Sequence, residues 1–274
     1  MKWIGKSTKQ LIVFEATGAY HRQLEFALGA NGLPAAKVNP KQARRFAQAT
    51  GRLAKTDRVD AAMLARMGAV LSLEPQVPPE RSLHDLRELL SARRALIKDQ
   101  TAARTRQATA TLLLIKRQLD ARLKQIGTDI GKVDTAMAEI VAQDAPMSER
   151  MVILQSIPGI GRVTAITMLI DMPELGTLDG KQVVSLAGLA PISQQSGKWQ
   201  GKERIQGGRA TLRRALYMPA LVAVRFNPDL KEKYDQLVQA GKQKKVALIA
   251  IMRKLLVMAN TLLRDGRQWT ENRP

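Results

Sequence analysis

Three carboxylates near the start of the chain have the residue types and spacing to hold a metal ion. Glu15 ends the apolar run 11–14, which is typical of a buried strand. Asp57 and Asp60 lie three residues apart at the head of a helical pattern, so their side chains share one helix face. Carboxylate oxygens in such settings are ligands that Mg²⁺ prefers. Stabilisation of a helix N-terminus also explains the two aspartates, but it does not explain Glu15.

The net charge indicates a polyanionic partner. The chain of 274 residues has 44 Lys and Arg against 24 Asp and Glu, a net charge of +20. Basic groups gain free energy by displacing counterions from phosphates, so nucleic acid is the expected partner. The excess is present throughout and is largest beyond residue 146, which makes that part the strongest candidate for binding a phosphate backbone. The alternative is a soluble basic protein with a solvated surface.

Several classes of site and location are disfavoured by composition. The chain has no cysteine, which excludes disulfides and thiolate metal sites. His21 and His84 are far apart in sequence, which argues against a zinc site or a Ser-His triad. We expect no stretch that reaches the length of a membrane span, and no signal peptide at the N-terminus. A cytoplasmic, nucleoid-associated protein without a membrane partner is therefore expected. Aromatic residues make up only 4%, so base stacking is not expected to dominate recognition.

The first 70 residues alternate between strand and helix patterns. We expect a strand at 11–14, a helix at 18–31 and a strand-like piece at 33–38. Pro40 suits the start of the next helix, and Thr56 suits the N-cap of the helix that carries Asp57 and Asp60. After this helix, three prolines mark a linker: Pro75, Pro78 and Pro79.

Residues 82–144 contain no proline and predict one or two long helices. Apolar residues recur there at intervals of 3 or 4, as in a coiled coil. These positions are Ile115, Leu119, Leu123, Ile126, Ile130, Val133, Met137 and Ile140. Gly127 and Gly131 are the expected place of a break between two arms. Such a pattern serves either helix packing within one domain or a dimerising or spacing arm.

The segment 156–165 has the form of a helix-hairpin-helix turn. Its Pro-Gly-Ile-Gly sequence contains Gly159 and Gly161, and Arg162 follows. Glycines allow backbone amides to approach a phosphate, and the N-terminus of the next helix favours an anion. The alternative is a purely structural joint between two helices.

A small polar loop follows with Ser193 and Ser196. Basic residues flank it: Lys198, Lys202, Arg204, Arg209, Arg213 and Arg214. This arrangement could place a hydroxyl near a phosphate, although serine-glycine loops are more often plain turns. Two helices, at 229–238 and 242–263, are expected to complete the chain.

Several strings of the sequence match one family in order. They are Phe14-Glu15-Ala16-Thr17-Gly18, Lys55-Thr56-Asp57-Arg58-Val59-Asp60-Ala61, Ile157-Pro158-Gly159-Ile160-Gly161, Ala187-Gly188-Leu189-Ala190-Pro191, Ser196-Gly197 and Leu212-Arg213-Arg214-Ala215-Leu216-Tyr217. The chain thereby resembles the DEDD-type insertion-sequence transposases, the group that includes pilin-gene invertases and bridge-RNA-guided recombinases. The match extends from about residue 12 to residue 263.

The resemblance implies a mainly α protein with a small α/β part. Its domains would be a partial RuvC-like, RNase H-type domain at 1–80, a coiled coil at 81–145 and a helical C-terminal transposase domain at 146–274. The latter would contain the helix-hairpin-helix and the serine loop. The implied partners are DNA, both element ends and target, with a guide RNA in some relatives, and further copies of the chain in a dimer or tetramer.

The resemblance also implies residue roles. Of the family's four metal-binding acids, three match here, namely Glu15, Asp57 and Asp60, with Mg²⁺ as the ion. Ser196 fits the family's serine nucleophile best, and Ser193 fits it less well. The family's first acid lies on an earlier strand, and only ten residues precede Leu11. We therefore expect an N-terminally truncated recombinase whose activity the missing aspartate puts in question.

Two other functions stay open at this point. The first is a non-catalytic DNA- or RNA-binding remnant that keeps the coiled coil and the helix-hairpin-helix. The second is a RuvC-like nuclease that hydrolyses phosphodiesters without a serine intermediate. Metal binding by the three acids separates a recombinase from the binder, and a covalent serine adduct separates it from the nuclease.

Overall fold

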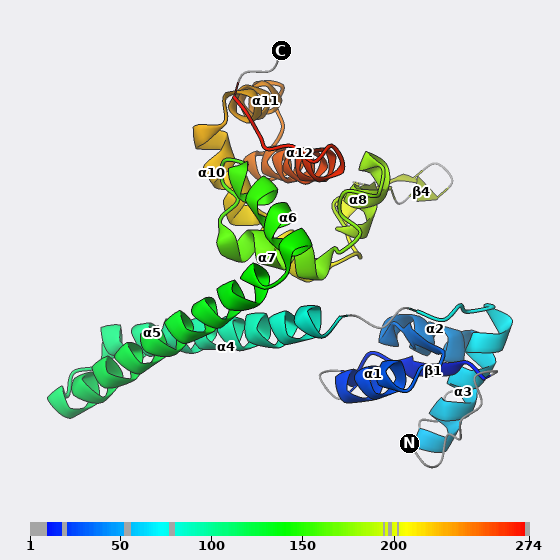
Figure 1. Cartoon of the computed structure of the whole chain (residues 1–274). Coiled ribbons are helices and arrows are strands. Elements are labelled where there is room, and N and C mark those ends of the chain that lie inside the picture. Colours follow the sequence, from blue (N-terminus) through cyan, green and yellow to red (C-terminus); the bar gives the residue numbers. More distant parts are fainter. Residues whose placement is uncertain are drawn as a thin grey trace. The chain divides into compact units, whose positions relative to one another are not determined.

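The computed structural model describes residues 10–17, 21–51, 56–76, 80–193, 195–196, 199–201 and 203–271. The chain divides into two compact units, residues 1–84 and 85–274 (Figure 1). The described elements are mainly helices, and the described strands form three two-stranded sheets. The prediction of a mainly α protein with a small α/β part is therefore confirmed, while the RuvC-like fold of the first unit stays a prediction.

The first unit contains a βαβ arrangement followed by two helices. Its elements are β1 (Ile12–Glu15), α1 (His21–Ala30), β2 (Ala35–Val38), α2 (Pro40–Ala49) and α3 (Asp57–Val70). β1 and β2 are parallel, with Ile12 opposite Ala35 and Glu15 opposite Val38. A parallel pair requires a crossover connection, and α1 provides it. The predicted strands and helices of this region are confirmed to within a few residues.

Two apolar clusters lie on opposite sides of β1. Phe14 belongs to a cluster with Leu28 and Leu33, whereas the neighbouring Val13 packs against the α2–α3 cluster. This division follows from the alternation of side chains along a strand. Gly68 lets α3 come close to the sheet, since a Cβ at that position would lie 2.7 Å from Val13 Cγ2.

The predicted starts of α2 and α3 are correct. Asn39 caps α2 by accepting a hydrogen bond from the Lys41 amide (2.8 Å), and Pro40 begins the helix. The Thr56 hydroxyl accepts from the Val59 amide (3.3 Å) and caps α3. Both caps satisfy amides that have no partner inside the helix.

The second unit contains a long antiparallel helical hairpin. α4 (Arg81–Thr109), which begins just before the unit boundary, and α5 (Leu113–Ala142) lie side by side (Figure 1). Arg93 Nε donates to Asp134 (2.6 Å), and nearer the tip Gln107 donates to Asp120. The bonded residues are 41 positions apart in the first pair and 13 in the second. Because this separation falls toward the tip, the two helices run in opposite directions.

The predicted break at Gly127 and Gly131 is wrong, because both residues lie inside α5. A helical glycine costs roughly 1 kcal/mol relative to alanine, which the packing of a 30-residue helix outweighs. The break instead falls at residues 110–112. There the Thr109 hydroxyl donates to the Arg106 carbonyl (3.1 Å), a local bond of the kind that competes with helix continuation.

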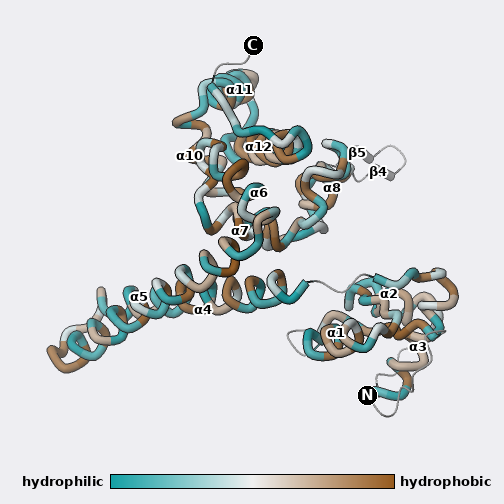
Figure 2. The backbone as a smooth tube through the Cα atoms, viewed as in Figure 1, coloured by the Kyte–Doolittle hydropathy of each residue, from teal (hydrophilic) through white to brown (hydrophobic). Residues whose placement is uncertain are grey.

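The apolar positions of α5 are used within the chain along most of its length. Leu119, Ile126 and Met137 are buried, as are Leu90 and Ala103 of α4. The tip differs, because four consecutive residues there, 112–115, are exposed by 64%, 61%, 68% and 41%. Figure 2 shows this apolar end of the hairpin.

The rest of the second unit is a helical domain with short strands. Its helices are α6 (Ala145–Ser156), α7 (Arg162–Asp171), α8 (Gly180–Leu186), α9 (Ala210–Ala215), α10 (Tyr217–Phe226), α11 (Pro228–Gln239) and α12 (Lys244–Arg264). Its strands are β3 (Pro191–Ile192), β4 (Gln195–Ser196), β5 (Trp199–Gln200) and β6 (Arg204–Ile205). α12 packs against α6, α8, α10 and α11 and forms the centre of this domain.

By length and composition, α12 could cross a membrane, so the expectation that no stretch reaches that length is wrong. Half of its apolar window is buried inside the protein. Residues such as Ile251, Leu255 and Leu256 are fully buried against the surrounding helices. The apolar run is therefore accounted for as the core helix of the domain.

Candidate functional site

The three predicted acids lie in the local settings that the sequence indicated. Glu15 ends β1, and its carboxylate accepts a hydrogen bond from the Thr17 hydroxyl (3.0 Å). Asp57 and Asp60 occupy the first turn of α3, beyond the Thr56 cap. No group of three His, Asp or Glu side chains in the described part of the chain is placed to hold a metal. The described residues thus offer an aspartate pair with suitable chemistry, but not a complete metal site.

The helix-hairpin-helix turn joins α6 to α7, and its two glycines differ in their surroundings. Gly159 has φ +97°, and a Cβ there would lie 2.6 Å from the Pro219 carbonyl oxygen of α10. This glycine therefore serves close packing against α10. Gly161, the N-cap of α7, has open space around it, and both Gly161 and Arg162 are exposed. An exposed glycine N-cap followed by an exposed arginine is compatible with phosphate binding, which stays a prediction.

Ser196 lies in a small two-stranded hairpin of β4 and β5, which we call the serine hairpin. In it Gln195 pairs with Gln200, and Ser196 pairs with Trp199. Figure 1 shows it beyond α8. Ser193 is exposed between β3 and this hairpin. Lys198 and Lys202 lie outside the described residues.

The predicted phosphate-binding arginines divide into two groups. Arg209 and Arg213 are engaged inside the protein. The Arg209 guanidinium makes a two-bond ion pair with Glu174 (2.6 and 2.7 Å). The Arg213 guanidinium donates to the carbonyls of Gly207 (2.7 Å) and Gly188 (3.2 Å). These two arginines therefore hold the base of the segment that carries the serine hairpin.

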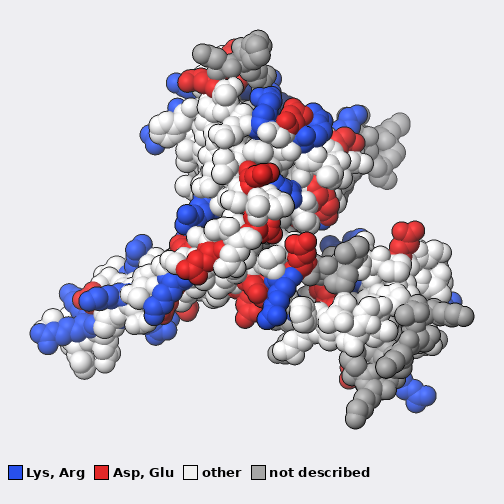
Figure 3. Space-filling model, viewed as in Figure 1, with Lys and Arg blue, Asp and Glu red and all other residues white. Residues whose placement is uncertain are grey.

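Arg204 and Arg214 form the other group. Both are exposed, and neither makes an ion pair with an acid in the described part of the chain. Figure 3 shows further basic side chains over the α12 region of the domain. Guanidinium groups without an acidic partner can bind phosphate oxygens through paired hydrogen bonds.

Gly188 approaches Gly207 and Gly208 closely, beside the Arg213 guanidinium. All three glycines have positive φ, at +68°, +72° and +57°, and a Cβ on Gly188 would overlap the Gly207 carbonyl. Only glycine adopts such backbone angles without strain at this separation. The two backbone segments are thereby brought together, and Arg213 bonds to a carbonyl of each.

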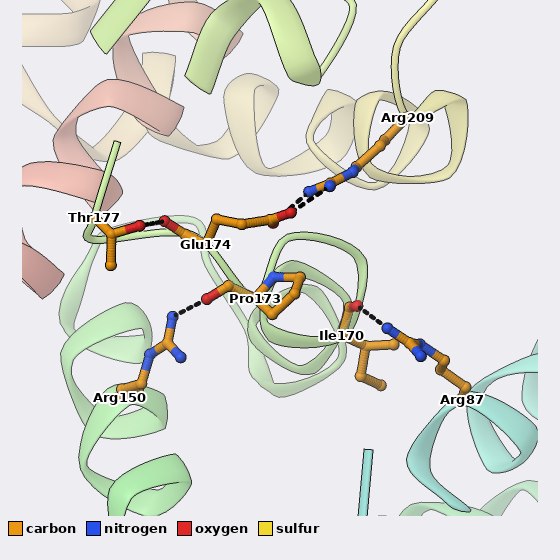
Figure 4. A network of polar contacts seen from close by, with 7 residues as sticks. All are labelled: Arg87, Arg150, Ile170, Pro173, Glu174, Thr177 and Arg209. Carbon is orange, nitrogen blue, oxygen red and sulfur yellow. Dashed lines mark hydrogen bonds and ion pairs between the residues drawn. The ribbon is translucent and has the colours of Figure 1, made fainter. Parts of the chain in front are cut away.

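The segment between α7 and α8 is fixed by a polar network that the sequence did not predict (Figure 4). Arg150 donates to the carbonyls of Pro173 (3.2 Å) and Leu175 (2.8 Å), and Arg87 donates to that of Ile170 (3.3 Å). On α12, the buried Asn260 accepts from the Gly176 amide (2.7 Å) and donates to Leu178 (2.8 Å). An asparagine inside an apolar helix was the one signal available in the sequence, because buried amides need partners.

The Glu174–Arg209 pair shifts the ionisation of both groups. The hydrogen bonds from Arg209 lower the pKa of the Glu174 carboxyl, and those to Glu174 raise the pKa of Arg209. Burial alone acts in the opposite direction on each group, so the pairing is the dominant cause. The pair joins the α7–α8 segment to the start of α9 and favours the charged forms at neutral pH.

Comparisons with known proteins identify the family. One family model, described as a transposase and named for the DEDD transposases of IS110, matches residues 1–116. A second, described as the IS116/IS110/IS902 transposase family, matches residues 151–235. The pilin gene-inverting protein of Moraxella lacunata is 34% identical over 270 residues, covering 95% of this chain and 82% of that protein. The chain belongs to the IS116/IS110/IS902 transposase family.

Other relatives agree with this membership. The pilin gene-inverting protein of Moraxella bovis is 33% identical over the same length and coverage. The IS900 42 kDa protein of Mycobacterium paratuberculosis is 30% identical over 190 residues, covering 64% of this transposase and 46% of that protein. Transposases bind DNA, and DEDD transposases are generally metal-dependent. The basic charge and the acid pair of this transposase fit both properties.

The Glu174–Arg209 pair makes the stability of the transposase depend on pH. Because the pKa of Glu174 is lowered in the fold, its contribution is present above the unfolded pKa and is lost as pH falls through the folded one. We predict that Arg209→Gln lowers the free energy of unfolding at neutral pH, and that this difference shrinks as the pH falls below the ordinary pKa of a glutamate carboxyl. Since both side chains are partly exposed, the effect is modest.

Urea unfolding of the wild type and the variant across this pH range tests the prediction. Arg264→Gln is the matched control, because it removes a more exposed ion pair, with Asp265. A difference for Arg209→Gln that stays constant with pH would contradict the proposed coupling.

Proposed function

We propose that this transposase is a site-specific DNA recombinase that cleaves and rejoins strands through a covalent phosphoserine intermediate. The observation that carries the proposal is the similarity to the pilin gene-inverting proteins over 95% of the chain. Inversion of a gene, which their name states, requires DNA strands to be cut and rejoined in a new order. The net charge of +20 supports binding to the DNA backbone, in the cytoplasm with the nucleoid.

Ser196 is the proposed nucleophile. Its Oγ attacks the phosphorus, an Oγ–P bond forms, and the P–O bond to the leaving sugar oxygen breaks. The serine proton passes to a base, and the leaving oxygen takes up a proton. The phosphoserine keeps the bond energy, so a second sugar hydroxyl can reverse the step without ATP. A serine hydroxyl is a weak nucleophile and needs a precisely placed phosphate, which the exposed Arg204 and Arg214 can help to hold.

Ser196→Ala is predicted to abolish covalent attachment of the protein to DNA carrying the element end, because the attacking oxygen is gone. Attachment is measured as a shifted, denaturant-resistant band on a gel. Ser193→Ala is the matched control and should keep the adduct, and DNA affinity should be unchanged in both variants. An adduct that survives Ser196→Ala and disappears with Ser193→Ala would assign the role to Ser193.

We further propose Mg²⁺ as the metal ion, with Asp57 and Asp60 as two of its ligands and Glu15 as a third. A hard divalent cation prefers carboxylate oxygens, and two acids on one helical turn can bind it together. When bound beside a phosphate, such an ion draws charge from the phosphoryl oxygens. The described residues show the aspartate pair on α3 but do not bring Glu15 into a group with it.

Asp60→Asn is predicted to weaken Mn²⁺ binding, measured by electron paramagnetic resonance with Mn²⁺ in place of Mg²⁺. A neutral amide replaces a charged ligand, so we expect the affinity to fall by about tenfold or more. Glu139→Gln, an exposed acid on α5, controls for the loss of one negative charge. Equal Mn²⁺ affinity in the two variants would refute the proposed ligand role.

We also propose that the transposase forms a homo-oligomer, a dimer or tetramer, through the α4–α5 hairpin. Its tip exposes four consecutive large apolar residues, Leu112, Leu113, Leu114 and Ile115. Soluble monomers rarely expose contiguous apolar surface of this kind, and a second copy of the chain would cover it. Oligomers also suit a reaction that must hold several DNA ends. A guide RNA is a further partner that we propose.

Leu113→Lys combined with Leu114→Lys is predicted to lower the molar mass in solution, because two charges would be buried in the proposed contact. Light scattering on the eluate of a sizing column measures the mass. Gln118→Lys with Gln125→Lys, two exposed positions farther along α5, adds the same charge and should leave the mass unchanged. A wild type that elutes as a monomer would refute the proposal directly.

A non-catalytic DNA- or RNA-binding protein is the second candidate function. The absence of a three-acid metal cluster from the described residues favours it. A binder would retain DNA affinity but give no adduct with any substrate. A hydrolytic nuclease would cleave DNA without an adduct, so the Ser196 experiment separates all three functions.

A further inference from the structure

A groove lies between the β3–β6 strand pair and the last two helices. It has a volume of about 520 Å³ and is partly open to solvent. Apolar side chains line it from both walls, among them Ile205 of β6 and Val246 and Ile249 of α12. Arg204, Lys242 and Arg253 also line it. We call it the α12 groove.

The cations of the α12 groove are uncommitted, in contrast to Arg209 and Arg213. Arg204, Lys242 and Arg253 form no ion pair with an acid of the described chain. Glu203 is the only acid among the lining residues, so the groove has a net positive charge. Basic groups left without acidic partners gain most from a phosphate ligand.

The α12 groove lies next to the serine hairpin in the chain. One of its walls is formed by β3 and β6, which pair through Pro191 with Ile205 and Ile192 with Arg204. The serine hairpin is the excursion between these two strands. The groove wall therefore lies within a few amino acids of the serine hairpin along the chain. A DNA strand bound at the hairpin is expected to pass near the groove.

We infer that the α12 groove binds an unpaired nucleotide of the DNA strand adjacent to the cleaved phosphate. The inference rests on the proposed recombinase function and adds a substrate subsite to it. The volume suits a ligand of nucleotide size, the apolar walls suit a base and sugar, and the three cations suit the phosphates. A base reaches an apolar groove wall only when it has left the duplex. The lining contains no aromatic ring, so no particular base is selected by stacking.

Disulfide trapping tests the location, because the chain has no cysteine of its own. Val246→Cys introduces one thiol in the groove at a side chain that is 46% exposed. The probe is an element-end duplex with a short single-stranded stretch that carries a thiol-tethered nucleotide. We expect cross-linking by Val246→Cys and none above background by Met218→Cys, a 62% exposed control on α10. Equal cross-linking by the two variants would overturn the inference.

Salt-dependent binding tests the cations. Lys242→Gln with Arg253→Gln should weaken binding of a single-stranded oligonucleotide and reduce the slope of log K against log salt by about 1.4, for two contacts. Arg225→Gln with Lys231→Gln removes the same charge from exposed positions outside the groove and should change the slope little. Equal slopes for the two double variants would refute the role of these cations.

Neither measurement requires strand cleavage, so the two proposals fail separately. Normal trapping in the groove without any serine adduct would remove the recombinase function and leave the nucleotide subsite. A serine adduct with no trapping at Val246→Cys would remove the nucleotide subsite and leave the recombinase function.

Discussion

The burial of α12 is the interaction on which the second unit depends. This helix packs against α6, α8, α10 and α11, and its Ile251, Leu255 and Leu256 are fully buried. Each such side chain contributes about 1.5–3 kcal/mol by leaving water. Asn260 on the same helix binds the backbone of the α7–α8 segment. That segment carries Glu174, which is the partner of Arg209. The position of the serine hairpin thus depends on a helix that contains none of the predicted catalytic residues.

The excess of basic residues serves two different purposes. Some arginines make tertiary contacts inside the protein, as Arg150 and Arg213 do by donating to backbone carbonyls. Others, such as Arg204 and Arg253, keep their charge free beside a groove. Net charge therefore indicates affinity for polyanions only after the arginines that are engaged in internal contacts are left out of the count.

Much of the local structure follows from short-range chemistry and could be predicted. The caps at Asn39 and Thr56 and the strand before Glu15 depend on residues a few positions apart. The hairpin break was misplaced because the glycine penalty in α5 is small compared with the packing of a long helix. The helix α12 was predicted to within two residues, but its apolar window also meets the length and composition of a membrane span, and its burial in the domain accounts for that window.

The sequence by itself determined the family, the order of elements and the residue types at the candidate sites, because these are properties of motifs and local periodicity. Only the tertiary structure decided which of those residues are available. Glu174 and Arg209 are 35 positions apart, and Arg213 bonds to Gly188 across 25. No spacing rule encodes such pairs, since they arise when packed helices bring distant segments together. The same packing left Arg204, Lys242 and Arg253 around one groove.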